Sequence, residues 1–145
     1  MELPLSDLYP VNQIVLSGQV VSGRHLVQID EVPIDLTSTE LVALTDLVRA
    51  RVGTEHGISS LPSLESKNNV IHTTIWRMRR DLDRGLGLGA GDRLVRHVLR
   101  SRYLLAVERQ AIVIDPSIAI LVPAVLSERV LRDLLPSADL AMTEW

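Results

Sequence analysis

The sequence predicts an α+β fold in which an N-terminal antiparallel sheet precedes three helices, a β-hairpin and a short C-terminal helical extension. Short β-branched runs separated by turn residues fill residues 13–36, and two further strand-like runs lie within residues 93–107. Between these segments, apolar residues recur at helical spacing after a helix-start signal at Thr37. A chain of 145 residues suffices for one domain with a small appendage. We therefore expect one domain over residues 1–107 and an extension over residues 108–145.

Composition and hydropathy indicate a cytoplasmic protein. Cysteine is absent, which excludes disulfides and thiolate metal sites and fits a reducing compartment. The first ten residues lack the basic region and the apolar run of a signal peptide. The most apolar window, residues 111–126, is interrupted by Asp115, Pro116 and Pro123, and it is shorter than the roughly 20 residues of a membrane span. We expect no membrane partner.

Charge is distributed unevenly along the chain. The net charge is −3, but the segment from Lys67 to Arg102 holds nine basic residues and only three acidic ones. The rest of the chain carries a surplus of nine negative charges. This asymmetry predicts a basic binding face on an acidic body, although a merely solvated basic helix and loop would give the same composition.

Both strand segments contain recognisable turns. Within residues 13–36, Ser22-Gly23 and Asp30-Glu31 are typical of hairpin turns, so three or four short antiparallel strands are expected. Within residues 93–107, apolar runs on either side of residues 99–102 predict two strands joined by a turn at those positions.

Two helices are expected between these segments. Thr37 and Glu40 form a capping box, in which the hydroxyl and the carboxylate accept the first free N–H groups of a helix. This helix is expected to end at Gly53, and its apolar stripe consists of Leu41, Leu44, Leu47 and Val48. A short second helix is expected within residues 58–66, beginning near Ser60.

The third helix, expected over residues 68–84, is the most informative segment. Its apolar stripe, spaced four, three and four residues apart, consists of Ile71, Ile75, Met78 and Leu82. The other side carries Asn69, Thr73, Arg77, Arg80 and Arg84, flanked by His72, Trp76 and Arg79. Arginine can bind guanine through two hydrogen bonds and threonine can contact the thymine methyl, so this side suits a DNA major groove. An ordinary amphipathic helix is the alternative, but its closely spaced arginines would repel one another without an anion between them.

The glycine-rich residues 85–91 raise the question of a phosphate site. A Walker A loop requires Gly-Lys-Ser/Thr, which is absent, and a dinucleotide fingerprint requires a strand before the glycines and a helix after them. Here the order is reversed, so we expect a hinge between helix and hairpin, with Gly85 ending the helix in a left-handed conformation. The histidines lack metal-ligand spacing, and no nucleophile motif is present. We expect no cofactor, no metal and no enzymatic activity.

Three segments resemble the OmpR/PhoB-type winged helix-turn-helix DNA-binding family. Residues 36–53 read LTSTELVALTDLVRARVG and are similar to its strand-to-first-helix junction. Residues 71–82 read IHTTIWRMRRDL and resemble its recognition helix, and residues 95–107 read VRHVLRSRYLLAV and resemble its wing. The resemblance covers residues 13–107. Within the family, RMRRDL followed by YLLAVERQAIVID looks most like the bacterial antibiotic-regulatory (SARP) transcriptional regulators, in which a helical activation domain follows the wing.

The resemblance implies a nucleoid-associated transcription regulator that binds double-stranded DNA sequence-specifically. Residues 69–84 would lie in the major groove, with the turn at residues 99–102 on the backbone or in the minor groove. In the wing, Leu99-Arg100-Ser101-Arg102 replaces the family's Arg-Gly-x-Gly, so contacts from Arg100 and Arg102 are our own inference. The expected DNA-binding residues are Lys67, Asn69, Thr73, Thr74, Trp76, Arg77, Arg79, Arg80, Arg84, Arg100 and Arg102.

The acidic, aliphatic extension and the acidic body leave two questions open. A helix within residues 125–135 would either pack on the body or support a homodimer or a regulatory contact through residues 111–135. The second function class is a winged helix that binds a protein, such as an RNA polymerase subunit or another regulator, rather than DNA.

Overall fold

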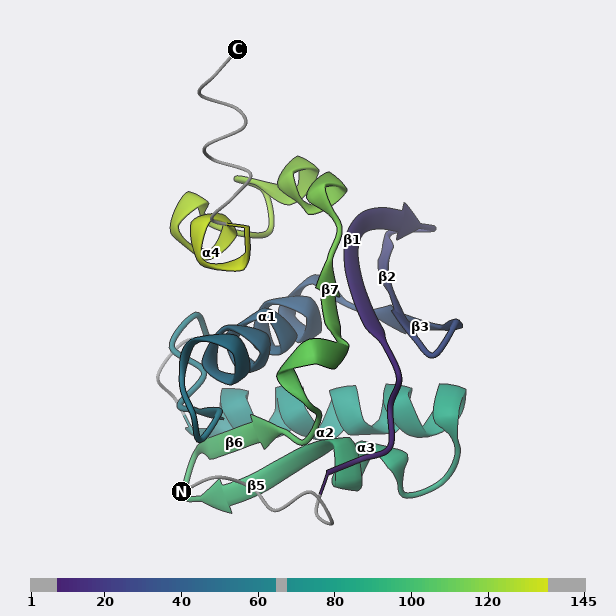
Figure 1. Ribbon diagram of the computed structural model, residues 1–145, viewed down its shortest axis with the longest axis vertical. Helices are drawn as coiled ribbons and strands as arrows, with labels where there is room; N and C mark the ends of the chain where they lie inside the picture. Colours follow the sequence, from purple (N-terminus) through teal and green to yellow (C-terminus); the bar gives the residue numbers. More distant parts are fainter. Residues whose placement is uncertain (1–7, 65–67, 136–145) are drawn as a thin grey trace.

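The computed structural model describes residues 8–64 and 68–135 and has a mixed α+β architecture (Figure 1). Strands β1 (Ile14–Val21), β2 (Arg24–Ile29) and β3 (Val32–Leu36) form an antiparallel meander, which confirms the strands expected over residues 13–36. A fourth strand, β7 (Ile112–Ile114), pairs with β1 in parallel and completes a sheet of order β3-β2-β1-β7. The expected C-terminal extension therefore contributes a strand to the N-terminal sheet.

Helix α1 (Ser38–Gly53) begins and ends where the sequence predicts. The Glu40 amide donates to Thr37 Oγ1 at 3.2 Å, and the Thr37 amide donates to Glu40 Oε1 at 3.3 Å, so the capping box is confirmed. The predicted apolar stripe is buried and consists of Leu41, Leu44, Leu47 and Val48.

The helix expected within residues 58–66 is wrong over its described part, residues 58–64. The chain instead forms β4 (Ile58–Ser59), which pairs antiparallel with β6 (Arg102–Leu105). Directly before β4, Gly57 adopts a left-handed φ of 68°, and the Arg51 guanidinium donates to two carbonyls of the preceding loop. This turn returns the chain along β6 in an extended conformation. Residues 65–66 lie outside the described residues.

Helix α2 (Asn68–Leu86) confirms the third predicted helix, and its apolar stripe, Ile71, Ile75, Met78 and Leu82, is buried. A single turn, α3 (Ala90–Leu94), follows it and leads into β5 (Val95–Leu99). Strands β5 and β6 form an antiparallel hairpin, as predicted, and the second sheet has the order β4-β6-β5. Figure 1 shows this hairpin in front of α2, at the end of the molecule away from helix α4 (Glu128–Leu134).

The glycine-rich segment packs closely instead of forming a hinge. Helix α2 continues through Gly85, and the left-handed residue is Gly87, with a φ of 114°, so the expectation that Gly85 ends the helix is wrong. Gly91 lies directly on the α2 backbone, where an added Cβ would stand 2.6 Å from Arg79 Cα. Its amide donates to Asp83 Oδ1 at 2.7 Å. These contacts fix α3 against α2.

The extension packs on the body, as one of its two interpretations predicted. After the short 3-10 turns η2 (Arg109–Ala111) and η3 (Pro116–Leu121), helix α4 (Glu128–Leu134) buries Val130 and Leu134. Asp133 of α4 accepts hydrogen bonds from Arg49 of α1 at 3.0 and 2.5 Å. Over the described ranges, no helix combines the length and the apolar character that crossing a membrane requires.

We predict that Gly91→Ala lowers the free energy of unfolding by about 1–3 kcal/mol, because the methyl group forces α3 away from α2. Gly53→Ala is the matched control, since an added Cβ at Gly53 meets nothing within 4 Å, and it should change stability by less than about 1 kcal/mol. Urea unfolding followed by circular dichroism measures both. Equal stability of the two variants would contradict the close approach at Gly91.

Candidate nucleic-acid interface

Helix α2 presents a different set of side chains to each of its surroundings, because successive residues turn by about 100° around a helix axis. One side is the buried apolar stripe. A second side, with His72, Arg79 and Asp83, contacts the segment from α3 to the hairpin. A third side carries Thr74 and Asp81 and is buried. The remaining side, here called the outer face, consists of Thr73, Trp76, Arg77, Arg80 and Arg84, all exposed.

Arg79 fastens the hairpin to α2. Its Nε and Nη2 groups donate to the Val95 carbonyl at 3.0 and 2.7 Å, and its guanidinium lies 5.7 Å from the centroid of the Tyr103 ring. Its side chain is only 24% exposed. Arg79 was expected to contact DNA, but two of its N–H donors already bind the Val95 carbonyl at the base of the hairpin.

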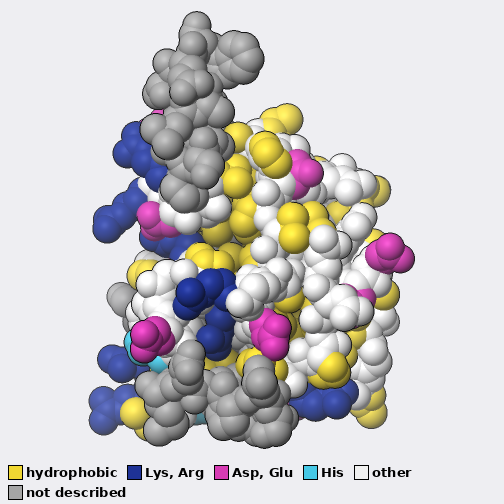
Figure 2. Space-filling model, in the orientation of Figure 1, with side chains coloured by type: hydrophobic (Ala, Val, Ile, Leu, Met, Phe, Trp, Pro, Cys, Tyr) yellow, Lys and Arg dark blue, Asp and Glu magenta, His cyan; other side chains and the backbone are white. Residues whose placement is uncertain are grey.

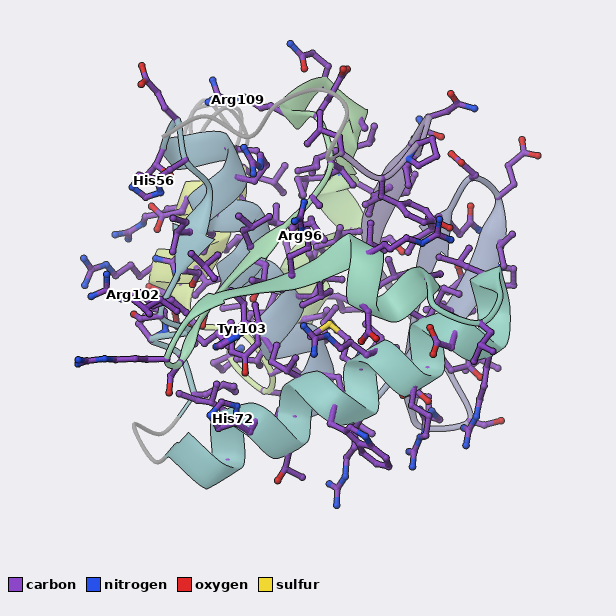
Figure 3. All side chains as sticks on the ribbon, turned by 90° about the horizontal axis from the view of Figure 1, so that it is seen from below. His56, His72, Arg96, Arg102, Tyr103 and Arg109 are labelled. Carbon is purple, nitrogen blue, oxygen red and sulfur yellow. The ribbon has the colours of Figure 1, made fainter. Side chains whose placement is uncertain are left out.

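The Tyr103 hydroxyl and His72 Nδ1 form a second link, at 2.6 Å, and Figure 3 shows the two side chains side by side. Burial raises the pKa of Tyr103, while the nearby Arg79 charge opposes this shift, so the phenol remains neutral and able to donate. Sequence reasoning missed His72 and Asp83 as positioning residues. The signal was their spacing from Arg79, seven residues before it and four after it, which places all three on one side of a helix.

The hairpin tip, residues 99–102, carries two exposed arginines. Arg100 and Ser101 form the turn, and Arg100 adopts a left-handed φ of 53°. The Arg100 and Arg102 side chains are exposed, and Leu99 beside them is 60% exposed. Because the base of the hairpin is fastened to α2, the tip has a defined position relative to the outer face.

The outer face contains an arginine stacked on an indole. Trp76 is 61% exposed, and the Arg80 guanidinium lies 5.2 Å from the centroid of its ring. This cation–π contact orients Arg80 along the helix while leaving its N–H groups accessible. In Figure 3, a row of side chains projects from the side of α2 that is turned away from the rest of the molecule.

A hollow of about 500 Å³ extends the outer face toward the N-terminus of α1. Arg77 and Thr73 line it from α2, and Thr37 and Thr39 line it from the first turn of α1. Hydroxyl groups, a guanidinium and a helix N-terminus are groups that bind phosphate oxygens.

The remaining expected site residues have different positions. Thr74 is wrong as an outward residue, because it is 6% exposed and its hydroxyl donates to the Val70 carbonyl at 2.8 Å. Arg84 is exposed but pairs with Asp81 at 3.4 Å. Lys67 lies outside the described residues, and Asn69 lies in α2 with a side chain that also falls outside them.

Two buried carboxyl groups, Glu40 of α1 and Asp81 of α2, lie next to each other. Glu40 is 2% exposed and Asp81 5% exposed, and Asp81 also pairs with Arg24 at 3.3 Å. Burial, together with the neighbouring Asp81 carboxyl, raises the pKa of Glu40 to about 7. No described group donates to Glu40 Oε2. A proton on this oxygen would satisfy it by donating to Asp81, so the neutral form of Glu40 fits the site.

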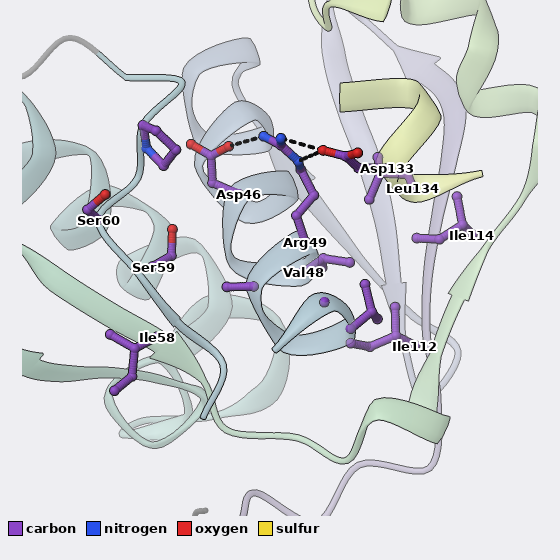
Figure 4. A pocket seen from close by; sticks show the side chains of 14 residues that line it. Asp46, Val48, Arg49, Ile58, Ser59, Ser60, Ile112, Ile114, Asp133 and Leu134 are labelled. Carbon is purple, nitrogen blue, oxygen red and sulfur yellow. Dashed lines mark hydrogen bonds and ion pairs between the residues drawn. The ribbon is translucent and has the colours of Figure 1, made fainter. Parts of the chain in front are cut away.

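A second hollow, of about 780 Å³, lies across α1 (Figure 4). Val48 and Val52 of α1 line it, β4 lies along one side, and β7 with α4 lies along the other. Its charged groups are paired with one another, because Arg49 bridges Asp46 at 3.2 Å and Asp133. These lining groups offer no nucleophile next to a base.

Comparison with known proteins adds no information on this interface. No protein-family model matches the chain, and no curated protein or solved structure shows significant similarity to it. Exposed arginines gather on the outer face, where Arg80 stacks on Trp76, and at the hairpin tip.

We predict that the free energy of unfolding contributed by Glu40 falls as the pH rises from 4.5 to 7. The folded chain holds a proton up to about pH 7 that the unfolded chain, with the ordinary pKa of 4.5, releases earlier. In Glu40→Gln the amide oxygen accepts from Thr37 and the amide N–H₂ donates to Asp81. Between pH 4.5 and pH 8, the free energy of unfolding of the wild type should therefore fall by about 2–3 kcal/mol relative to that of Glu40→Gln.

Urea unfolding across this pH range measures the effect. The control is Glu128→Gln on α4, where the side chain is 77% exposed, and its pH profile should parallel that of the wild type. A Glu40→Gln profile that also parallels the wild type would show that Glu40 is ionised in the folded chain.

Proposed function

We propose that this protein is a sequence-specific transcription regulator of the winged helix-turn-helix type that binds double-stranded DNA. The observation that carries this proposal is the fastening of two cationic elements to each other. Arg77, Arg80 and Arg84 are exposed on α2, Arg100 and Arg102 are exposed at the hairpin tip, and Arg79 ties one element to the other. The resemblance of residues 13–107 to the OmpR/PhoB-type family supports the same assignment.

In the proposed complex, α2 enters the major groove by its outer face. Trp76 and the stacked Arg80 meet base edges, where arginine binds guanine and an apolar group contacts the thymine methyl. Arg77 and the hydroxyls at the N-terminus of α1 hold a phosphate at the edge of the groove. The hairpin tip places Arg100 and Arg102 on the backbone or in the minor groove.

A protein-binding role is the second candidate, and the hollow across α1 favours it. Strands β4 and β7 are edge strands of their sheets, and both border this hollow. An edge strand can accept an extended segment of another protein through backbone hydrogen bonds. In this alternative, RNA polymerase or another regulator would bind there, and substitutions on the outer face of α2 would leave binding unchanged.

A homodimer through residues 111–135 is a further part of the proposal. Ile120 is 76% exposed and Val113 38% exposed, and Figure 2 shows apolar side chains gathered over the upper half of this view. Helix α4 and the neighbouring η3 lie at the end of the molecule away from the hairpin, so a dimer contact through them would leave the outer face of α2 accessible. The proposed location is the cytoplasm, on the nucleoid.

We predict that Arg77→Ala combined with Arg80→Ala weakens DNA binding at least tenfold. The probe is a duplex selected by the wild type from a randomised pool, and fluorescence anisotropy measures affinity over a range of salt concentrations. If about six phosphates are neutralised, the wild-type log–log salt slope is about −5, and loss of the Arg77 phosphate contact makes it shallower by about 0.9. The control is Arg109→Ala, which removes an exposed cation that Figure 3 shows on the far side of the molecule from α2, and it should leave affinity within about twofold. Salt-insensitive wild-type binding would contradict the proposal.

We predict that Arg100→Gly separates DNA contact from folding. Glycine adopts the left-handed conformation of this turn residue without steric cost, so the free energy of unfolding should stay within about 1 kcal/mol of the wild type. Affinity for the selected duplex should fall about three- to tenfold, and the salt slope should become shallower by about 0.9. Unchanged affinity and slope would remove Arg100 from the interface.

A further inference from the structure

The hairpin tip exposes apolar side chains next to its arginines. Leu99 is 60% exposed and Val98 42% exposed, and Arg100 and Arg102 beside them are exposed as well. A single exposed leucine is ordinary on a protein surface. An exposed leucine in the last strand position before a tight turn, between cationic side chains, forms an apolar point within a cationic surface.

A β-bulge determines the direction of Leu99. His97 pairs with Tyr103 and Leu99 pairs with Arg102, so the register shifts by one residue at Val98. Adjacent residues of a strand face opposite sides, and Tyr103 faces α2 through its bond to His72. Leu99 therefore lies on the same side of the hairpin as Arg102 and on the opposite side from His97. Without the bulge, Leu99 and His97 would face the same side, because they are two positions apart in β5.

The base of the hairpin is held rigidly. Val95 accepts two hydrogen bonds from Arg79, Tyr103 bonds to His72, and the His97 ring lies 5.1 Å from the Tyr103 ring. These contacts hold the base of the hairpin in place, so a ligand that presses on the tip would deform before the hairpin moves.

We propose that Leu99 is a wedge that enters the minor groove of bound DNA and unstacks one base step, so that the DNA bends. This inference rests on the proposed DNA-binding function and goes beyond it by assigning a distortion of the duplex to one side chain. The positive charge of the tip favours DNA as its partner, because Arg100 and Arg102 would lie against the two phosphate backbones that border a minor groove. Apolar side chains delivered into a minor groove by such cationic elements unstack and kink base steps.

The test uses the full chain and selected duplexes of about 30 base pairs, each with 2-aminopurine at one position along the flank of the α2 site. Unstacking raises the fluorescence of this base. Wild-type binding should raise it about twofold or more at one step, and energy transfer between end labels should report a bend. Leu99→Ala should abolish both signals and weaken binding about tenfold, with an unchanged salt slope because no cation is lost.

Two controls keep the outcomes separate. Val21→Ala removes a half-exposed apolar side chain at the end of β1, away from the tip (Figure 1), and should leave fluorescence, bend and affinity at wild-type values. Urea unfolding should show Leu99→Ala to be as stable as the wild type, since its side chain is mostly exposed. Wild-type binding with normal salt dependence but without unstacking, or equal unstacking by Leu99→Ala, would overturn the wedge alone. Absence of wild-type binding to the pool would overturn the proposed function and the wedge together.

Discussion

The hydrogen bonds from Arg79 to the Val95 carbonyl are the constraint on which the geometry of the candidate interface depends. A guanidinium from the middle of α2 donates twice to the first residue of β5, at 3.0 and 2.7 Å, and is largely shielded from water. Charge-assisted bonds of this kind are stronger than bonds between neutral groups. Val95 is fully buried, so the loss of Arg79 would also leave its carbonyl without these donors. The orientation of the hairpin relative to α2 follows from this one contact more than from any other.

Electrostatics divides α2 into sides with separate tasks. Asp83 bonds to the Gly91 amide, and Asp81 pairs with Arg24 and Arg84, so the acids of this helix are engaged in holding the fold. Among the described residues, no acidic side chain pairs with Arg77 or Arg80, so their positive charges on the outer face are not neutralised by an ion pair. The net positive charge of the outer face is therefore smaller near Arg84, which pairs with Asp81, than near Arg80, which stacks on Trp76.

Local patterns predicted the local structure well. The capping box at Thr37, the apolar stripe of α2 and the strands of residues 13–36 depend on neighbouring residues, and all three appear in the structure. Contacts between distant segments could not be predicted in the same way. Strand β7 pairs with β1 from 98 residues away in the sequence (Ile14 with Ile112), and β4 replaces a helix because β6 offers a partner edge. The resemblance implied DNA contacts from Thr74 and Arg79, and periodicity could not correct this expectation, because it locates a buried stripe but does not show how many neighbours surround a helix.

The glycine-rich segment shows why this difference matters for function. As a flexible hinge it would let the hairpin adjust to the DNA, so that the protein would adapt to the duplex. Gly91 instead lets α3 rest on the α2 backbone, and Gly87 only turns the chain, so the spacing between the outer face and the hairpin tip is set before binding. A reader with two fixed elements favours duplexes whose grooves already match that spacing or deform to it at low cost. In the proposed complex, discrimination would therefore arise from the shape and deformability of the DNA as well as from base contacts, because Gly91 holds α3 against α2.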